Sequence, residues 1–134
     1  MVGDRVIPAP NQNSETEPYY NAFGEGRFLV PVCLACGKAH WYPRFFCPWC
    51  GGKTEPRDSK GEGIIYSYSV MRRVERPFAL AYVELAEGPR MMTNIVDCDF
   101  DGLAIGQKVR LAFKPAADGT AMPCFTPHGD AKGG

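Results

Sequence analysis

Two pairs of cysteines carry the clearest chemical signal in this sequence. Cys33 and Cys36 form one Cys-x-x-Cys motif, and Cys47 and Cys50 form a second after a ten-residue spacer, 37–46. A gap of two residues turns both sulfurs of a pair toward the same ion, and two such pairs are typical of a four-thiolate zinc site. We therefore expect one structural zinc ion. A closed shell of four sulfurs leaves no position for water, so this metal would stabilise the fold and would not catalyse a reaction.

Other uses of these thiols remain open at this point. Four thiolates also suit iron. Two disulfides would need an oxidising compartment, and residues 1–10 contain no apolar run that resembles a signal peptide, so we expect a cytoplasmic protein. A redox motif would need only one pair in a thioredoxin-like setting. His40 could replace a ligand, but with four cysteines at hand we expect it to be a spacer residue of a hairpin.

The composition restricts the class of protein. The chain has 134 residues, enough for one domain or two small ones, and 45% of them are hydrophobic. No apolar run approaches the length of a transmembrane helix, and we expect no membrane contact. Fifteen basic side chains balance fifteen acidic ones, which argues against a strongly basic nucleic-acid binder.

The segment around the cysteines is mildly electropositive. Five of the six charged side chains in residues 27–57 are basic: Arg27, Lys38, Arg44, Lys53 and Arg57 against Glu55. Four thiolates around a divalent ion would reduce this excess by two charges. The remaining positive charge suits a phosphate-bearing ligand or an acidic partner surface, and a solvated face explains it equally well.

A short helix is predicted before the cysteines. Residues 16–18 supply a capping hydroxyl, an acid in the first turn and a proline where its missing N–H is harmless. Tyr19, Tyr20 and Phe23 follow on one side of this helix. A helix this short is unstable alone in water, so its aromatic stripe must dock on another surface. That surface is either the chain's own zinc module or a partner protein, and the sequence fits both.

The spacer between the two motifs is rich in aromatic residues. We expect the side chains of residues 41–46 to cover the metal and to form the small core of a ribbon. Trp49 lies inside the second motif, where a side chain tends to point outward, and we expect it to pack on the next domain or on a partner. These features assign residues 1–15 to a flexible tail and residues 16–57 to the short helix and the zinc ribbon.

Residues 58–127 favour an all-strand domain, with a polar tail at 128–134. Apolar and polar side chains alternate along successive runs, and the first run is long enough to contain a bulge. The five runs are 64–74, 78–85, 90–96, 108–113 and 121–125. Their order, with a longer break between the third and the fourth, predicts a five-stranded OB-fold barrel. An SH3-like barrel or a small sandwich also fits the pattern. The predicted fold class is mostly β: a short helix, a zinc ribbon and then the barrel.

The predicted barrel offers no catalytic set. It contains no histidine, and its acids are scattered without a spacing that marks an acid–base couple. Cys98 and Cys124 are the remaining thiols, and neither has a histidine beside it in the sequence. Because free cysteines are so often buried, we expect both to be inert.

A basic cluster stands at the end of the first strand run. Arg72, Arg73 and Arg76 lie within five residues. Guanidinium groups at this density could bind phosphates or a carboxylate surface. The alternative is a solvated loop with one internal salt bridge to Glu75.

The motifs, taken in order, resemble one family. They are Pro18 to Ala22, Gly26 to Leu29, Cys33-x-x-Cys36-Gly37, Pro43-Arg44-x-x-Cys47-Pro48-x-Cys50-Gly51, Ala81 to Leu85, Glu87 to Arg90, Thr93 to Val96 and Leu103 to Val109. The chain is similar, over about residues 16–127, to the acyl-CoA-associated proteins in which a rubredoxin-like zinc ribbon precedes an OB fold. That family was formerly known as a domain of unknown function.

The resemblance implies a function that composition alone does not indicate. Members of this family are small accessory subunits beside thiolase-like, and sometimes enoyl-CoA hydratase-like, enzymes. The enzyme, and not the small subunit, supplies the catalytic residues. It implies a non-catalytic, zinc-binding subunit of a complex acting on a 3-oxoacyl-CoA, by carbon–carbon bond cleavage or acyl transfer. A coenzyme A thioester would then be bound through the partner. The expected contacts with partner or coenzyme A are Tyr19, Tyr20, Phe23, Trp49, Arg72, Arg73 and Arg76.

Two other functions fit parts of the sequence. Zinc ribbons and OB barrels also occur in single-stranded nucleic-acid-binding proteins, where Tyr66, Tyr68 and Tyr82 would be stacking platforms. The neutral barrel argues against this function, because such proteins track the backbone with a positively charged groove. An autonomous thiol enzyme using Cys98 or Cys124 is the third function, and it would be active as the purified chain alone.

Overall fold

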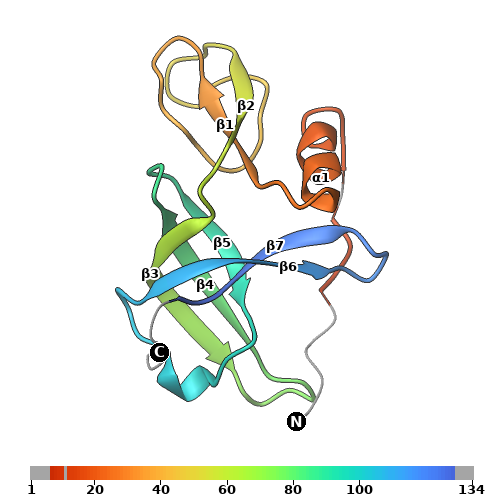
Figure 1. Cartoon of the computed structure of the whole chain (residues 1–134), viewed down its shortest axis with the longest axis vertical. Coiled ribbons are helices and arrows are strands. Elements are labelled where there is room, and N and C mark those ends of the chain that lie inside the picture. The colour runs from red at the N-terminus through yellow and green to blue at the C-terminus, as the bar shows by residue number, and fades with distance from the viewer. Residues whose placement is uncertain (1–6, 11, 129–134) are drawn as a thin grey trace.

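The computed structural model describes residues 7–10 and 12–128. It contains one short α-helix, a two-stranded sheet and a closed barrel of five strands (Figure 1). The elements are α1 (Glu17–Gly24), β1 (Leu29–Cys33), β2 (Thr54–Asp58), β3 (Glu62–Met71), β4 (Phe78–Leu85), β5 (Arg90–Ile95), the 3₁₀ turn η1 (Phe100–Gly102), β6 (Lys108–Pro115) and β7 (Ala121–Pro127). Within the described ranges, no helix has the length and apolar character needed to cross a membrane.

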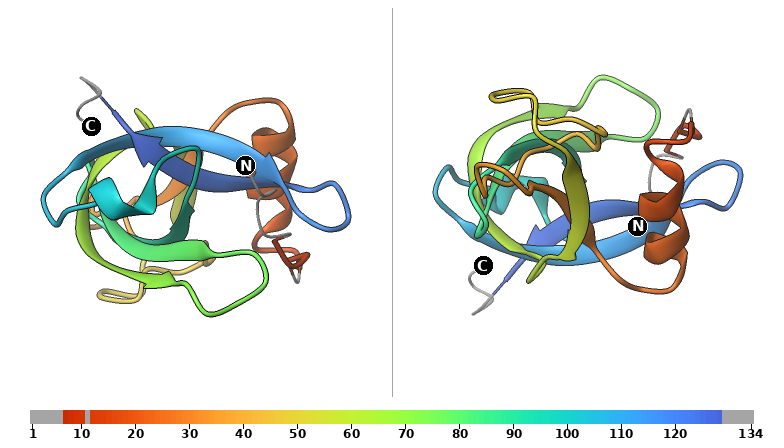
Figure 2. Two further views of the ribbon diagram at one scale, coloured as in Figure 1. Left: turned by 90° about the horizontal axis from the view of Figure 1, so that it is seen from below. Right: turned by 90° about the horizontal axis from the view of Figure 1, so that it is seen from above.

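The barrel has the strand order of an OB fold. Its order is β3-β4-β5-β7-β6, and β6 pairs again with β3 to close the ring (Figure 2). All pairs are antiparallel except β5 with β7, which run parallel and meet at Ile95 and Phe125. The register between β3 and β4 shifts between Ile65 and Ser67, which is the bulge expected in the first long run. The predicted fold class, mostly β with a zinc ribbon and an OB barrel, is confirmed.

Apolar side chains at alternate strand positions fill the barrel. The largest of them are Ile65, Val83, Met91, Ile95, Val109 and Phe125, each at most 2% exposed. Because side chains alternate across a strand, this set leaves a second set of side chains facing outward. One part of the outer surface is covered by α1, and the top of the barrel meets the two-stranded sheet (Figure 1).

Helix α1 docks on the chain itself. Phe23 is 2% exposed, and its ring lies 5.6 Å from that of Phe113 on β6 and 5.7 Å from that of Phe28. The hydroxyl groups of Tyr20 and Tyr42 are 3.1 Å apart. The aromatic stripe therefore packs on the barrel as well as on the ribbon, a wider surface than the zinc module that the sequence suggested.

The cap of α1 differs from the prediction. Thr16 makes no side-chain hydrogen bond to the first turn, although it occupies the capping position. Asn13 turns the chain into the helix instead, because its side-chain Oδ1 accepts hydrogen bonds from the backbone N–H of Glu15 and of Thr16. An asparagine side chain readily forms such a turn, and Thr16 is left with no exposed surface.

Three stretches depart from the expected elements. Residues 54–58 form β2, although part of this stretch was expected to be a polar boundary, because pairing with β1 supplies its hydrogen bonds. Strand β3 ends at Met71, so residues 72–77 form a loop and not a continuation of the strand. Ile7, in the expected N-terminal tail, is buried and bridges to Ala116. Of the tails expected at 1–15 and 128–134, residues 1–6, 11 and 129–134 lie outside the described residues.

Candidate metal centre

The four cysteines of the two motifs meet at one point. Their sulfur atoms all lie within 4.8 Å of one another, with 3.5 Å between those of Cys33 and Cys50 and 3.8 Å between those of Cys36 and Cys47. Four sulfurs at 2.3 Å from a central zinc ion would stand about 3.8 Å apart at the corners of a tetrahedron. The thiols are thus positioned to bind a metal ion, and both the donor set and the spacing fit zinc.

Local backbone geometry builds this cluster. Strand β1 ends at Cys33, and the N–H groups of Gly37 and Gly51 donate to the carbonyls of Cys33 and Cys47, which closes a tight turn in each motif. Both glycines have φ of +77°, a backbone conformation that is energetically unfavourable for residues with a Cβ. Gly52 is needed for space, because a Cβ there would lie 3.0 Å from the Cys33 sulfur.

Backbone amides stabilise the thiolate form of the first cysteine. The N–H groups of Cys36 and Ala35 both lie 3.3 Å from the Cys33 sulfur, and these hydrogen bonds lower the pKa of Cys33 to about 6. Cys50 receives a backbone hydrogen bond from Gly52 that lowers its pKa, but the neighbouring sulfurs outweigh it and raise the value to about 11. Burial opposes deprotonation of Cys47, but backbone hydrogen bonds from Cys50 and Trp49 lower its pKa as well.

His40 is not part of the thiol cluster. Its side chain is 2% exposed, and among the described residues neither ring nitrogen has a hydrogen-bond partner. Burial, and then the charge of Arg44, lowers its pKa. Its ring stands edge-on to that of Trp49 at 6.2 Å. His40 is thus a neutral core residue of the ribbon, in line with the structural role expected for it.

The aromatic residues of the spacer divide into two groups. Trp41 packs toward the barrel, with its ring 5.9 Å from that of Phe28. Phe45 and Phe46 were expected to cover the metal, and that expectation was wrong: they are 50% and 58% exposed. The spacer is too short and too closely tied to the cysteines for every ring to turn inward. Trp49 points outward as predicted and is 59% exposed.

The expected contact residues lie in different environments. Tyr19, Tyr20 and Phe23 are at most 8% exposed, because the chain's own barrel and ribbon cover them. This corrects their expected role, since a buried ring offers no surface to a partner. Trp49 lies at the ribbon surface, with the Lys38 ammonium 5.6 Å from its ring.

The basic cluster lies in the exposed loop between β3 and β4. Arg72 pairs with Asp101 at 2.7 Å, not with Glu75. Arg73 and Arg76 are exposed, and no salt bridge of the described residues includes them.

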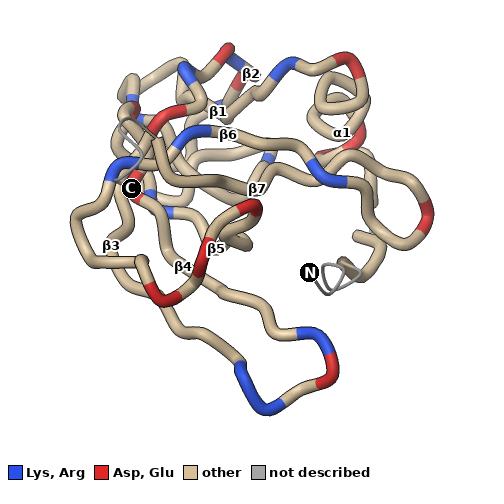
Figure 3. The backbone as a smooth tube through the Cα atoms, turned by 60° about the horizontal axis from the view of Figure 1, so that its bottom comes forward, with Lys and Arg blue, Asp and Glu red and all other residues tan. Residues whose placement is uncertain are grey.

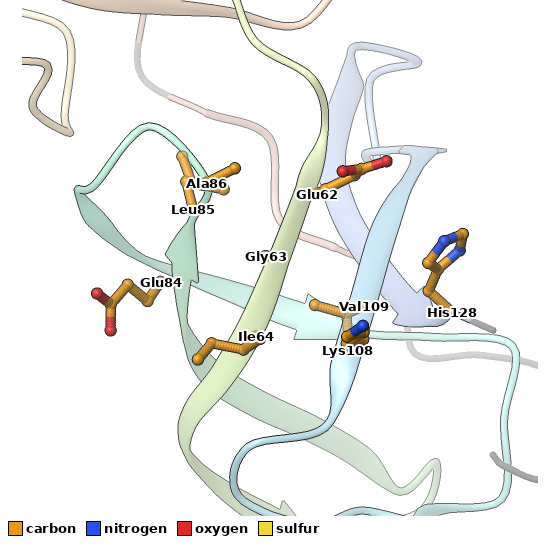
Figure 4. Close-up of a pocket in the computed structure, with 9 residues that line it drawn as sticks. All are labelled: Glu62, Gly63, Ile64, Glu84, Leu85, Ala86, Lys108, Val109 and His128. Carbon is orange, nitrogen blue, oxygen red and sulfur yellow. The ribbon is translucent and has the colours of Figure 1, made fainter.

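One hollow of the barrel surface, formed by described residues, contains titratable side chains but no catalytic arrangement. The hollow of about 390 Å³ in Figure 4 lies over Gly63 and has two carboxylates and an imidazole in its lining. Figure 4 shows Glu62 and Glu84 on opposite sides of β3 and pointing away from each other, with His128 beyond Glu62. Groups placed in this way do not converge on a reacting atom, as an acid–base couple must.

The two remaining thiols are poor nucleophiles. Cys124 is 1% exposed. Burial, with the charges of Asp99 and Asp97, raises the pKa of Cys98 to about 11. A thiol with such a pKa carries very little thiolate at neutral pH, and the thiolate is the reactive form.

The fold and the thiol cluster together define a zinc-ribbon protein with an OB barrel. Models of two domains match it in the same order: residues 21–55 match "ChsH2, rubredoxin-like zinc ribbon domain" and residues 56–114 match "ChsH2, C-terminal OB-fold domain". The chain is also 40% identical over 90 residues to a DUF35 domain-containing scaffold protein of Methanothermobacter thermautotrophicus, covering 61% of this chain and 68% of that one. The chain therefore belongs to the ChsH2-like DUF35 family.

Further relatives have longer chains or known structures. A probable enoyl-CoA hydratase alpha subunit of Thermomonospora curvata is 32% identical over 126 residues, which are 90% of this chain but only 40% of the relative. A solved structure described as "Ltp2-ChsH2(DUF35) aldolase" contains a chain with a TM-score of 0.77 and 31% identity, covering 89% of this chain and 98% of that one. A DUF35 protein of unknown function from Sulfolobus solfataricus has a TM-score of 0.64 at 13% identity over 87% of each chain, and it shows the fold alone.

Proposed function

We propose that this chain is a non-catalytic, zinc-binding accessory subunit that organises an enzyme acting on an acyl-CoA. The observation that carries this proposal is a built four-thiol metal centre beside a barrel in which the hollow over Gly63 brings no acid–base couple together and the Cys98 thiol is a poor nucleophile. A closed four-thiolate site stabilises a fold and performs no chemistry. The chemistry must then come from another protein, and the scaffold protein and the Ltp2-ChsH2 aldolase among the relatives support this division of labour.

The partner that we propose is a thiolase-type enzyme acting on a 3-oxoacyl-CoA. The names of two relatives support the class of reaction: an aldolase forms or breaks a carbon–carbon bond, and an enoyl-CoA hydratase acts on a coenzyme A thioester. An enoyl-CoA hydratase-like partner is the alternative within the same class. In this proposal coenzyme A binds through the partner in the cytoplasm, and Trp49, Arg72, Arg73 and Arg76 are the candidate contacts of this chain.

The metal in this proposal is one zinc ion held by Cys33, Cys36, Cys47 and Cys50. Its role is to fix the ribbon, which is too small to fold on a hydrophobic core of its own. The ribbon in turn contacts the barrel through Phe28, whose ring lies 6.2 Å from that of Phe125.

The test is purification of the tagged chain from its native host, with mass spectrometry and metal analysis of the eluate. We expect a stoichiometric enzyme of the thiolase or enoyl-CoA hydratase class and one zinc per copy of this chain. The recovered complex should turn over an acyl-CoA, whereas the chain alone should not. A zinc-loaded chain that elutes without any enzyme, or that turns over an acyl-CoA alone, would overturn the proposal.

A further inference from the structure

One wall of the barrel is left uncovered by the chain. Helix α1 lies beside β6 and β7 (Figure 2), where Phe23 contacts Phe113. The ribbon stands at one end of the barrel, where Phe28 contacts Phe125. Neither element contacts the outer face of β3, β4 and β5 to a comparable extent. This face is therefore left open to solvent.

Large apolar side chains occupy this bare face. Ile64 is 40% exposed, Tyr66 and Tyr82 are each 48% exposed, and Met92 is 58% exposed. Tyr82 on β4 is the direct neighbour of Met92 on β5, and Tyr66 stands at the bulge of β3 beside Tyr82. We call these four residues the open wall. Aromatic residues and methionine are the types enriched at protein–protein interfaces, and contiguous exposed apolar patches mark interaction sites.

The charges on the open wall neutralise each other. The Arg90 guanidinium lies 3.9 Å from the centre of the Tyr66 ring, and its Nε is 3.8 Å from a carboxylate oxygen of Glu84. Because Arg90 is already stacked on a ring and close to a carboxylate, it is a poor contact for the phosphates of a nucleic acid. The open wall favours an apolar protein surface over a nucleic acid.

A shallow hollow lies beside the open wall. It has a volume of about 250 Å³, and its lining includes Tyr82, Met92, Ser67, Ser69 and Leu80. A lining that combines small serine side chains with larger apolar ones suits one apolar side chain of a partner. The hydroxyl groups of the serines can satisfy a polar atom on that side chain or on the partner's backbone. Interfaces draw most of their affinity from such a filled pocket.

The rim of the open wall is cationic at the end where β3 meets β4. Figure 3 shows this loop projecting from the barrel with basic residues on both sides of one acid. Arg73 and Arg76 flank Glu75, and both arginines lie outside the salt bridges of the described residues. A complementary partner would place carboxylates around an apolar centre. A second copy of this chain is the competing occupant, and the oligomeric state measured below tests it.

We propose that the open wall is the surface that binds the catalytic partner, through an apolar anchor seated beside Tyr82 and Met92 and carboxylates facing Arg73 and Arg76. This inference rests on the proposed function, since it names the surface that an accessory subunit would use. It adds the strands of the barrel to the candidate contacts named above.

The experiment compares two variants of the tagged full-length chain. The double substitution Tyr82→Ser and Met92→Ser removes the anchor site, and Ile105→Ser removes a single apolar side chain that is 70% exposed on another loop. Both are outward-facing, so both should retain zinc and the wild-type melting temperature. The enzyme recovered with the wild-type chain is identified by mass spectrometry, purified separately and titrated against each chain. We expect the affinity to fall at least about 30-fold for the double variant and less than about threefold for the control.

The rim and the competing occupants are tested with the same proteins. Arg73→Glu with Arg76→Glu should slow association and weaken binding more at low salt than at high salt. Equal affinity of the double variant and the wild type would overturn this inference alone, while recovery of no enzyme by the wild type would overturn the proposed function as well. A wild-type dimer in light scattering that the double variant abolishes, or binding of a thymidine oligonucleotide that it abolishes, would assign the open wall to another occupant and overturn the inference.

Discussion

Each sulfur of the metal centre depends on its immediate neighbours. The backbone N–H groups of Ala35 and Cys36 favour the thiolate of Cys33, and the turns closed by Gly37 and Gly51 bring the two motifs together. A metal ion in this cluster neutralises charge that the amides only partly stabilise. At the scale of single residues, the fold of the ribbon therefore depends on the identity and the protonation state of four cysteine side chains.

Replacing one thiol should release the metal. We expect Cys33→Ser to lose its zinc and to lower the free energy of unfolding by about 3–5 kcal/mol, since metal binding contributes directly to folding. Zinc analysis and thermal melting measure both effects. Cys98→Ser is the matched control, because Cys98 lies outside the thiol cluster, and it should retain one zinc per chain. An unchanged melting temperature and unchanged partner binding in Cys33→Ser would argue against a structural zinc.

The thiol of Cys98 should react slowly at neutral pH. Its pKa is raised to about 11, so its thiolate fraction at pH 7.5 is lower than that of a free cysteine by roughly two orders of magnitude. Alkylation should accelerate about tenfold per pH unit between pH 7.5 and 10, because the thiolate increases as pH rises toward the pKa. Mass spectrometry of the Cys98 peptide, with a model cysteine peptide as control, measures the rate. Rapid labelling of Cys98 at pH 7 would contradict this prediction and support a role for Cys98 as a nucleophile.

At the scale of elements, helix α1 joins the two β structures. Its aromatic side chains fill the space between β1, β6 and β7, and Phe28 extends the same cluster to Trp41 of the ribbon. A helix of eight residues is not stable in isolation. Its stability must come from this packing, and the packing in turn determines how the ribbon is held on the barrel.

Truncating the centre of this cluster should be costly. We expect Phe23→Ala to lower the free energy of unfolding by about 3–5 kcal/mol, because it leaves a cavity among the rings of Tyr20, Phe28 and Phe113. Ile105→Ala is the control: its side chain is 70% exposed, and the effect should stay within about 0.5 kcal/mol. Urea unfolding of both variants gives the comparison. A loss below about 1 kcal/mol for Phe23→Ala would mean that the helix is not anchored as described.

A glycine in β3 tests how closely the barrel strands approach. A Cβ on Gly63 would lie 2.6 Å from the backbone oxygen of Glu84 and 2.6 Å from a methyl group of Val83. At such a distance the backbone of β4 would have to move away from the new methyl group, so Gly63→Ala should destabilise the barrel by about 1–3 kcal/mol. Gly102→Ala, where a Cβ would meet nothing within 4 Å, is the control. Thermal melting that ranks the two variants equally would contradict the packing of β3 on β4.

At the scale of the whole molecule, the metal and the barrel stabilise different parts of the chain. The barrel core around Ile65, Val83 and Phe125 reaches Leu29 and Val30 at the start of β1, whereas β2 has no buried side chain. This difference supports the division between residues 16–57 and 58–127, which stays a prediction.

Metal removal tests that division. We expect a strong chelator to abolish protection from hydrogen exchange in residues 29–58 while the amides of β3 to β7 stay protected. Helix α1 should lose part of its protection, because one of its two supports is gone. The control is the zinc-loaded chain after dialysis without chelator. Unfolding of the whole chain at one chelator concentration would show that ribbon and barrel form a single cooperative unit.

Several features of the protein follow from local patterns in the sequence. The spacing of Cys33, Cys36, Cys47 and Cys50 indicates a metal site because a tight turn has few conformations. The alternation along the strands indicates the barrel because a strand has a side-chain period of two residues. The outward direction of Trp49 and the bulge of β3 also follow from such rules.

Other features depend on contacts between distant parts of the chain. The sequence presents the stripe of Tyr19, Tyr20 and Phe23 without saying what covers it, and only the packing on β6 and β7 shows that the chain itself does. The exposure of Phe45 and Phe46 and the open wall around Tyr82 are likewise properties of the assembled molecule. The sequence pattern shows which side chains are apolar and favour burial. The limited space between barrel, ribbon and helix decides which of these side chains are buried. Tertiary structure therefore decides which apolar side chains are left for a partner.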